Sequence, residues 1–196
     1  MKPVSLLFLC LFSSVISFGQ TWTDGQLDSA NTASDVTYLT QVEKETIMYI
    51  NLARMYPWEF AQYEVQNYFG PKNSGDYVKD SPYRQSLIDE LDTAAAAPPL
   101  QPDETIYNYA ECFAIESGDN GIVGHTRINC PSDLYAECCS YGMQTGKDIA
   151  LQWLIDDDTP SLGHRRNCMN PDFTKIGVSF HTHKKWSYCA VADFQE

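Results

Sequence analysis

The hydrophobic positions recur with a helical period over most of the chain and with a strand period only near its end. Between Tyr38 and Met55, apolar side chains stand three and four positions apart, the spacing of one face of an α-helix. Pro57 cannot continue a helix and ends this one, and apolar residues then continue from Trp58 to Tyr63. The same spacing predicts three further helices, over residues 82–91 with 94–97 as an extension, 103–117 and 147–155.

Two apolar runs near the end of the chain predict paired strands. Lys175–His181 and Trp186–Phe194 are short segments rich in β-branched and aromatic residues, joined by a turn at residues 183–185. Residues 130–141 show no period and are expected to be irregular. Helices first and paired strands last predict an α+β sandwich with a small antiparallel sheet.

The first twenty residues have the layout of a secretory signal peptide. Lys2 precedes an apolar run from Val4 to Phe12, and small and polar residues follow. The run is too short to span a bilayer, which takes about 20 apolar residues. Residues 21–35 are polar and predict a flexible leader with no part in the core. The folded domain is therefore expected at residues 36–196, in an exported protein that is secreted, extracellular or periplasmic and has no transmembrane segment once the signal is removed.

The net charge and the cysteine count indicate which partners and which cross-links to expect. The formal net charge of −13 repels phosphate backbones, so nucleic acid is not an expected partner. An even number of cysteines remains after the signal peptide, and in an exported chain this indicates disulfides. The sequence does not determine which cysteines pair, and it is also compatible with one cysteine remaining a free thiol. A zinc site made of four cysteines is disfavoured because no CxxC spacing occurs. The six cysteines are Cys112, Cys130, Cys138, Cys139, Cys168 and Cys189.

Two of the four histidines are candidates for chemistry. His125 and His164 each follow a glycine, which permits backbone conformations closed to other residues. Glu137 lies shortly after His125, and the acidic run Asp156–Asp158 lies shortly before His164. If the chain folds back on itself, these side chains form a cluster. Such a cluster binds a divalent ion, acts as acid and base, or only hydrogen-bonds the core.

The remaining residues offer no other catalytic pattern. His181 and His183 alternate at a strand end beside two lysines and are expected to face solvent. Neither a GxSxG nor an HExxH motif occurs, so the sequence presents no serine nucleophile elbow and no metalloprotease helix.

The segment from Ser161 to Val178 resembles a signature of bacterial CAP domains, the superfamily of cysteine-rich secretory proteins, antigen 5 and plant pathogenesis-related proteins. Four blocks match in order between Tyr38 and Phe194, which is most of the mature chain. They are Asn51-Leu52-Ala53-Arg54 with Pro57 and Phe60-Ala61; Leu100 with Ala110 and Gly124-His125-Thr126; Ala136-Glu137-Cys138, where the family has Gly-Glu-Asn; and Gly163-His164-Arg165-Arg166-Asn167 with Ile176-Gly177-Val178.

The resemblance implies a three-layer α-β-α sandwich whose cleft carries two histidines and two acids. By position these are His125, Glu137, His164 and Asp156, with Asp157 as the alternative for the last. His125 and His164 would be the ligands of zinc or another divalent cation. Asp156 is one methylene shorter than the Glu of animal members.

The resemblance also implies two functions from different classes. The first is an exported binding or interaction module, whose ligand is a lipid or small apolar molecule or whose partner is an extracellular protein. The second is a secreted peptidase-like hydrolase, in which metal or a carboxylate activates water in the same cleft. A third interpretation is a scaffold in which the cluster only ties helices to the sheet.

Overall fold

The computed structural model describes residues 21–72, 74–131 and 136–196. The predicted signal peptide therefore lies outside the described residues. Within the described ranges, no helix is both long and apolar enough to cross a membrane.

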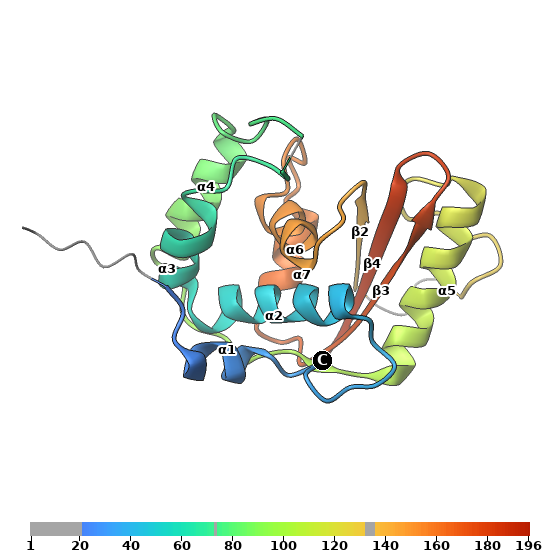
Figure 1. The fold of residues 1–196 in the computed structure, drawn as a ribbon, viewed down its shortest axis with the longest axis horizontal. Coiled ribbons are helices and arrows are strands. Elements are labelled where there is room, and N and C mark those ends of the chain that lie inside the picture. The colour runs from blue at the N-terminus through green and yellow to red at the C-terminus, as the bar shows by residue number, and fades with distance from the viewer. Residues whose placement is uncertain (1–20, 73, 132–135) are drawn as a thin grey trace, which may run out of the picture.

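The fold has three layers, with a four-stranded sheet between two groups of helices (Figure 1). The strand order is β1-β3-β4-β2; β2 and β3 both pair antiparallel with β4, while β1 pairs parallel with β3. Helix α5 covers one face, and α2, α6 and α7 pack on the other side. The predicted α+β class and α-β-α sandwich are confirmed, although the short β1 makes the sheet mixed. The bounds are β1 Gln101–Pro102, β2 Ala136–Tyr141, β3 Lys175–His183, β4 Ser187–Gln195, α2 Gln41–Met55, α5 Glu104–Asn120, α6 Gly146–Ile155 and α7 Gly163–Met169.

The other helices extend the layer that contains α2. They are α1 (Asp24–Ala30), α3 (Pro57–Phe60), a π-helical turn η1 (Ala61–Val65) and α4 (Pro82–Leu91). Helix α4 begins at Pro82, as predicted, and the Ser81 hydroxyl caps it by accepting from the backbone N–H groups of Tyr83 and Arg84. It ends at Leu91, so the expected extension over residues 94–97 does not form.

A buried glutamate connects the first long helix to the sheet. Glu43 and Thr40 form a reciprocal capping box at the start of α2. The Glu43 Oε1 atom also accepts the backbone N–H of Phe180 in β3 at 2.8 Å. One carboxylate therefore caps α2 and fixes its position against the central strand.

Two glycines allow α5 to lie directly on β3. A Cβ atom at Gly177 would stand 2.1 Å from the backbone nitrogen of Tyr107 in α5, and one at Gly118 would stand 2.1 Å from the carbonyl oxygen of Thr182. Both contacts are to backbone atoms, which cannot move aside as a flexible side chain can. The glycine of the Ile-Gly-Val block is therefore a packing requirement.

The paired Asn and Arg of the first motif block are structural. Asn51 is fully buried; its amide donates to the carbonyls of Ala30 and Leu100, and its oxygen accepts the N–H of Leu100. Arg54 is also buried, and its guanidinium donates to four backbone carbonyls, those of Pro98, Cys168, Asn170 and Phe173. These bonds hold the segment after α7 against α2, so both side chains position the fold.

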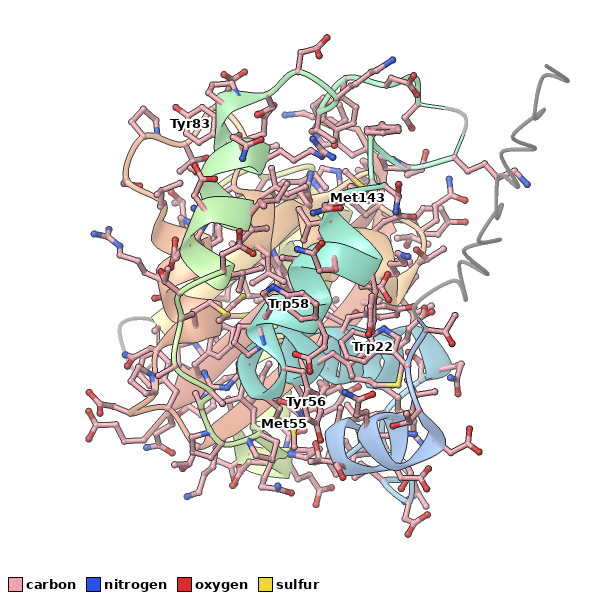
Figure 2. The ribbon with its side chains drawn as sticks, turned by 90° about the vertical axis from the view of Figure 1, so that its left-hand side faces the viewer. Trp22, Met55, Tyr56, Trp58, Tyr83 and Met143 are labelled. Atoms are coloured by element: carbon pink, nitrogen blue, oxygen red, sulfur yellow. A yellow bond between two sulfur atoms is a disulfide. The ribbon has the colours of Figure 1, made fainter. Side chains whose placement is uncertain are left out.

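The leader at residues 21–35 differs from the prediction. Its polar composition indicated a flexible segment, but helix α1 forms there, and Ala30 and Ala33 are buried in the main core. Trp22 donates from its indole nitrogen to Glu64 Oε1 at 2.6 Å, and its ring lies 6.1 Å from that of Tyr56. Figure 2 shows Trp22, Tyr56 and Trp58 on the same side of the molecule. A few well-placed apolar residues are enough to dock a segment whose average composition is polar.

Two further local predictions were wrong. The segment expected to be irregular contains β2, whose pairing with β4 compensates for its weak strand pattern. His183 was expected to face solvent but is 3% exposed. Its Nε2 atom donates to the carbonyl of Ile122, and its Nδ1 accepts from the N–H groups of Lys185 and Trp186. Because α5 and the loop after it cover the strand end, this imidazole organises the β3–β4 turn.

Candidate functional site

His164 lies at the start of α7, where one carboxylate holds both the helix and the ring. Asp156 Oδ1 is 2.7 Å from His164 Nδ1, and Asp156 Oδ2 accepts the backbone N–H groups of His164 and Arg165 at 2.9 and 3.3 Å. Burial raises the pKa of Asp156, but the His164 bond and charge and the backbone bonds outweigh it, so the net pKa is lowered. The sequence analysis predicted no helix over these residues and so missed α7.

Asp156 reaches this position from an unusual backbone conformation. It is the residue that ends α6, in the left-handed region with φ of 55°. Aspartate tolerates this region better than most residues because its short side chain can bond locally. Of the two acids that the sequence left open, Asp156 pairs with His164, whereas Asp157 accepts a hydrogen bond from Ser81 in the segment before α4.

The second histidine forms a similar pair from the other side. His125 Nδ1 lies 2.7 Å from Glu137 Oε1, where Glu137 is the second residue of β2. The bond to Glu137 is the main cause of a raised pKa for His125. Gly124, the residue before His125, has a φ of 94°, a backbone conformation that favours glycine, as expected. Gly163, before the other histidine, is not in the left-handed region and serves only as the first residue of α7.

The two pairs face each other. The rings of His125 and His164 have centroids 6.1 Å apart and planes inclined by 35°. In each ring Nδ1 is hydrogen-bonded to a carboxylate, and this bond fixes the orientation of the imidazole. The structure therefore brings together the four residues predicted from the motif, His125, Glu137, His164 and Asp156.

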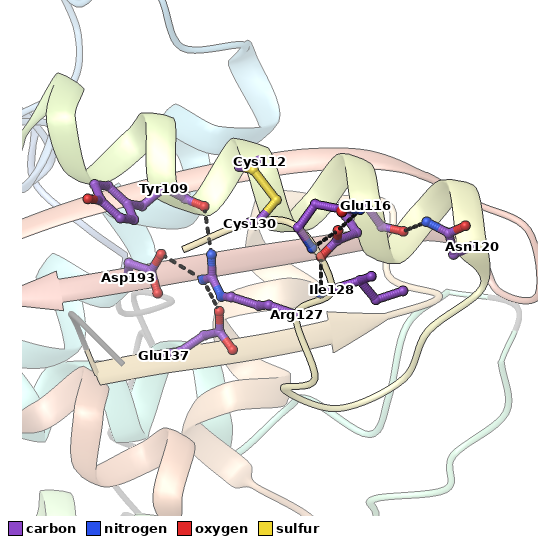
Figure 3. The surroundings of a disulfide bond; sticks show 10 residues. Tyr109, Cys112, Glu116, Asn120, Arg127, Ile128, Cys130, Glu137 and Asp193 are labelled. Atoms are coloured by element: carbon purple, nitrogen blue, oxygen red, sulfur yellow. Dashed lines mark hydrogen bonds and ion pairs between the residues drawn. A yellow bond between two sulfur atoms is a disulfide. The ribbon is translucent and has the colours of Figure 1, made fainter. Parts of the chain in front are cut away.

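An arginine that the sequence analysis missed supports the Glu137 side. The Arg127 guanidinium donates to Glu137 Oε2, to Asp193 Oδ2 at 3.2 Å and to the carbonyl of Tyr109, as Figure 3 shows. It also stacks over Phe113 at 4.7 Å. Despite this cation, burial and the charge of Glu137 raise the pKa of Asp193 to about 7.

The loop that carries Arg127 is tied to α5. A disulfide joins Cys112 in α5 to Cys130, and Glu116 accepts the backbone N–H groups of Ile128 and Asn129 at 2.7 Å each (Figure 3). This disulfide bears out the expectation of disulfide bonding from the cysteine count, and the pairing was not readable from the sequence. The thiols of Cys138, Cys139, Cys168 and Cys189 are free in the structure.

Cys139 is the second residue that the sequence analysis did not place in the site. It lies on the same face of β2 as Glu137, and its Sγ is 3.6 Å from His125 Nδ1 and 3.7 Å from Glu137 Oε1. One ligand atom from each of His125, Glu137 and Cys139 lies within 4.8 Å of the others, a group able to hold a metal ion. Burial and Glu137 raise the pKa of Cys139 well above its usual value. A strand alternation drawn through Glu137 would have indicated Cys139, had β2 been predicted.

A small cavity opens beside His164. Its volume is about 220 Å³, and its walls include Asp156, Cys139 and a set of aromatic residues. Trp153 is one of these and is fully buried, and its indole N–H is the one buried side-chain donor or acceptor among the described residues without a partner. The aromatic wall residues are Tyr68, Tyr77, Tyr141 and Trp153.

The fold and the facing histidine–carboxylate pairs define the class of this domain, an α-β-α sandwich with a His/acid cleft. The family follows from the sequence comparison: the model of the cysteine-rich secretory protein (CAP) family matches residues 49–194, so the chain belongs to that family. Among solved structures, the chain is similar to an outer surface protein from Borrelia burgdorferi, with 22% identity and a TM-score of 0.40 over 57% of this chain and 86% of that one. A comparison with curated proteins gave no match.

Proposed function

We propose that this protein is an exported binding module whose cleft holds a divalent ion of the zinc class. In this proposal the ion replaces the bond between His125 Nδ1 and Glu137 Oε1, so that His125, Glu137 and Cys139 are ligands. His164 completes the set from the opposite wall. The observation that carries the proposal is the grouping of the first three ligand atoms within 4.8 Å.

The chemistry of these donors suits zinc. Imidazole nitrogen, carboxylate oxygen and thiolate sulfur are its usual protein ligands, commonly four in a tetrahedral arrangement. The centroid separation of 6.1 Å between the histidine rings leaves space for an ion at about 2 Å from a nitrogen of each. Arg127 and Asp156 would act behind the ligands, since they orient Glu137 and His164 respectively.

The contacts of Glu137 favour binding over hydrolysis. In the proposed site Oε1 is a ligand of the ion and Oε2 accepts from Arg127, so neither carboxylate oxygen is left to act on water. A general base needs an oxygen within hydrogen-bond reach of the water that it activates. A bound ion would supply charge and fix the cleft residues, which suits recognition of a ligand. The peptidase-like alternative therefore has weaker support.

Zinc titration by calorimetry tests the proposal. We expect His125→Ala to abolish binding, and Cys139→Ser and His164→Ala to weaken it by about tenfold or more. His181→Ala is the matched control, because His181 lies on β3 and its ring bonds to its neighbour Thr182. Equal affinities in the wild type and all of these variants would contradict the proposal. Weakening by the two cleft histidine variants alone would remove Cys139 from the ligand set and leave the histidine pair.

Export and the organic ligand belong to the same proposal. The signal-like first twenty residues support export, and N-terminal sequencing of the protein from culture medium or periplasm tests it. The aromatic cavity of about 220 Å³ supports a small ligand rather than a bulky lipid. Native mass spectrometry of the purified protein would detect a co-purifying lipid or small apolar molecule. An extracellular protein partner stays a prediction, which a pull-down from culture supernatant would test.

A further inference from the structure

We propose that Cys138 and Cys168 form a second disulfide, which ties strand β2 to helix α7 behind the cleft. The bond would join the strand that carries Glu137 and Cys139 to the helix that carries His164. It would therefore fix the separation of the two cleft walls. The formation of the bond does not depend on the proposed metal site.

The geometry around α7 brings the two sulfurs to the same helical turn. Cys138 Sγ lies 3.6 Å from the carbonyl oxygen of His164 and 3.8 Å from Asn167 Nδ2. Cys168 is one turn after His164, and side chains of an α-helix lean back over the preceding turn. The Cys168 side chain therefore leans toward the same His164 carbonyl that Cys138 Sγ contacts.

The surroundings hold both cysteines in place. Each is fully buried in the main core. Asn167 donates to the carbonyl of Glu137 at 3.1 Å, and the carbonyl of Cys168 accepts from Arg54 at 2.9 Å. A cross-link here would thus join two segments that already pack against each other.

The other free cysteines are placed for different partners. Cys139 follows Cys138 in β2 and so points to the opposite face, where it contacts His125. Cys189 lies in β4 and donates to the carbonyl of Ala114 at 3.4 Å. Among the described residues, Cys138 and Cys168 are therefore the remaining pair suited to a bond.

The chemistry needs an oxidant, for which we name a small-molecule disulfide such as oxidised glutathione. One cysteine thiolate attacks a sulfur of the oxidant, forms a mixed disulfide and releases one glutathione thiolate. The second thiolate attacks the mixed disulfide, closes the Cys138–Cys168 bond and releases the other glutathione. The two cysteines lose two protons and two electrons, and the oxidant becomes two thiols. Both cysteines are buried in the folded protein. We therefore expect the disulfide to form during folding in an oxidising compartment, before the two thiols are covered.

Oxidative refolding with a glutathione buffer, followed by alkylation and non-reducing peptide mapping, tests the proposal. We expect the chain to contain both the Cys112–Cys130 and the Cys138–Cys168 links. Fragmentation of the linked peptide distinguishes Cys138 from its neighbour. Cys139→Ser and Cys189→Ser are matched controls and should keep the link, whereas Cys138→Ser and Cys168→Ser should lose it. Recovery of folded protein with alkylated Cys138 and Cys168, or a link through Cys139, would overturn the proposal.

Thermal unfolding provides a second measurement that does not depend on mapping. Under oxidising conditions, the double variant Cys138→Ser/Cys168→Ser should unfold about 4–10 °C below the wild type. After both proteins are reduced, the difference should shrink to that of the altered packing alone. The same difference before and after reduction would mean that the link had not formed.

Discussion

Asp156 binds His164 twice, through Nδ1 of the ring at 2.7 Å and through the backbone N–H at 2.9 Å. The same carboxylate therefore caps helix α7 and sets the direction of the imidazole. A negative charge at a helix N-terminus is also favourable because the unpaired N–H groups there carry partial positive charge. The position of the cleft histidine and the stability of its helix are consequently coupled.

Substitution of Asp156 tests this coupling. Asp156→Asn keeps the size and the tolerance of the left-handed backbone but removes the charge, so we expect it to lower the free energy of unfolding by about 1–3 kcal/mol. Asp158→Asn is the matched control, since Asp158 has the same positive φ of 55° and is exposed. Urea unfolding measures both. Equal stability of the two variants would show that Asp156 does not support α7.

Gly177 is expected to be the least replaceable residue of the Ile-Gly-Val block. Gly177→Ala places a Cβ 2.1 Å from the backbone of α5, so either the helix must move away from β3 or the protein does not fold. We expect a loss of about 3 kcal/mol or more, at the upper end of the effects of overpacking. Thermal unfolding followed by circular dichroism measures it. Gly163→Ala, whose added Cβ meets only Ser161 Oγ at 3.6 Å, should remain close to the wild type.

Asp193 predicts a pH dependence of stability. Its pKa is raised to about 7 in the folded protein from a usual value of 3.8, so the folded state binds more protons between these values. Stability therefore falls as the pH rises from about 4 to 7, because the ionised carboxylate is costly in the folded state. Asp193→Asn removes this cost but keeps an acceptor for Arg127. The stability of the variant relative to the wild type should increase from about pH 5 to pH 8, by on the order of a few kcal/mol.

Thermal unfolding at several pH values distinguishes this effect from a general one. Asp172→Asn is a suitable control because Asp172 is exposed, and its stability difference should not change with pH. A constant difference between Asp193→Asn and the wild type across this range would contradict the prediction.

The disulfide between Cys112 and Cys130 should hold the loop that carries Arg127. We expect Cys112→Ala/Cys130→Ala to lower the free energy of unfolding by about 2–4 kcal/mol. The amides of Ile128 and Asn129, which donate to Glu116, should lose protection against hydrogen exchange. Cys189→Ala removes a buried thiol without a cross-link and should leave this protection unchanged. Retained protection in the double variant would show that Glu116 alone holds the loop.

Much of the cleft was predictable because its residues belong to short sequence motifs, whose other members are fixed by burial or by close backbone contacts. His125, Glu137 and His164 were indicated by the order of the motif blocks, and the structure brings them together. Asn51 and Gly177 belong to the same blocks, and their burial and close contacts show why few other residues fit there. Cys139 was not predicted because strand β2 was not recognised. Arg127 was not predicted because its partners, Glu137 and Asp193, are distant from it in sequence and no local pattern indicates these contacts.

The sequence by itself determined the class of fold, the start of α4 and three of the cleft residues, His125, Glu137 and His164. These depend on periodicity, capping and short motifs, which act over a few residues along the chain. The tertiary structure decided that α1 joins the core, that His183 is buried and that Asp156 rather than Asp157 pairs with His164. Each of these depends on which surface covers a residue. That surface comes from chain segments distant in sequence, so only the packing of the whole domain decides the outcome.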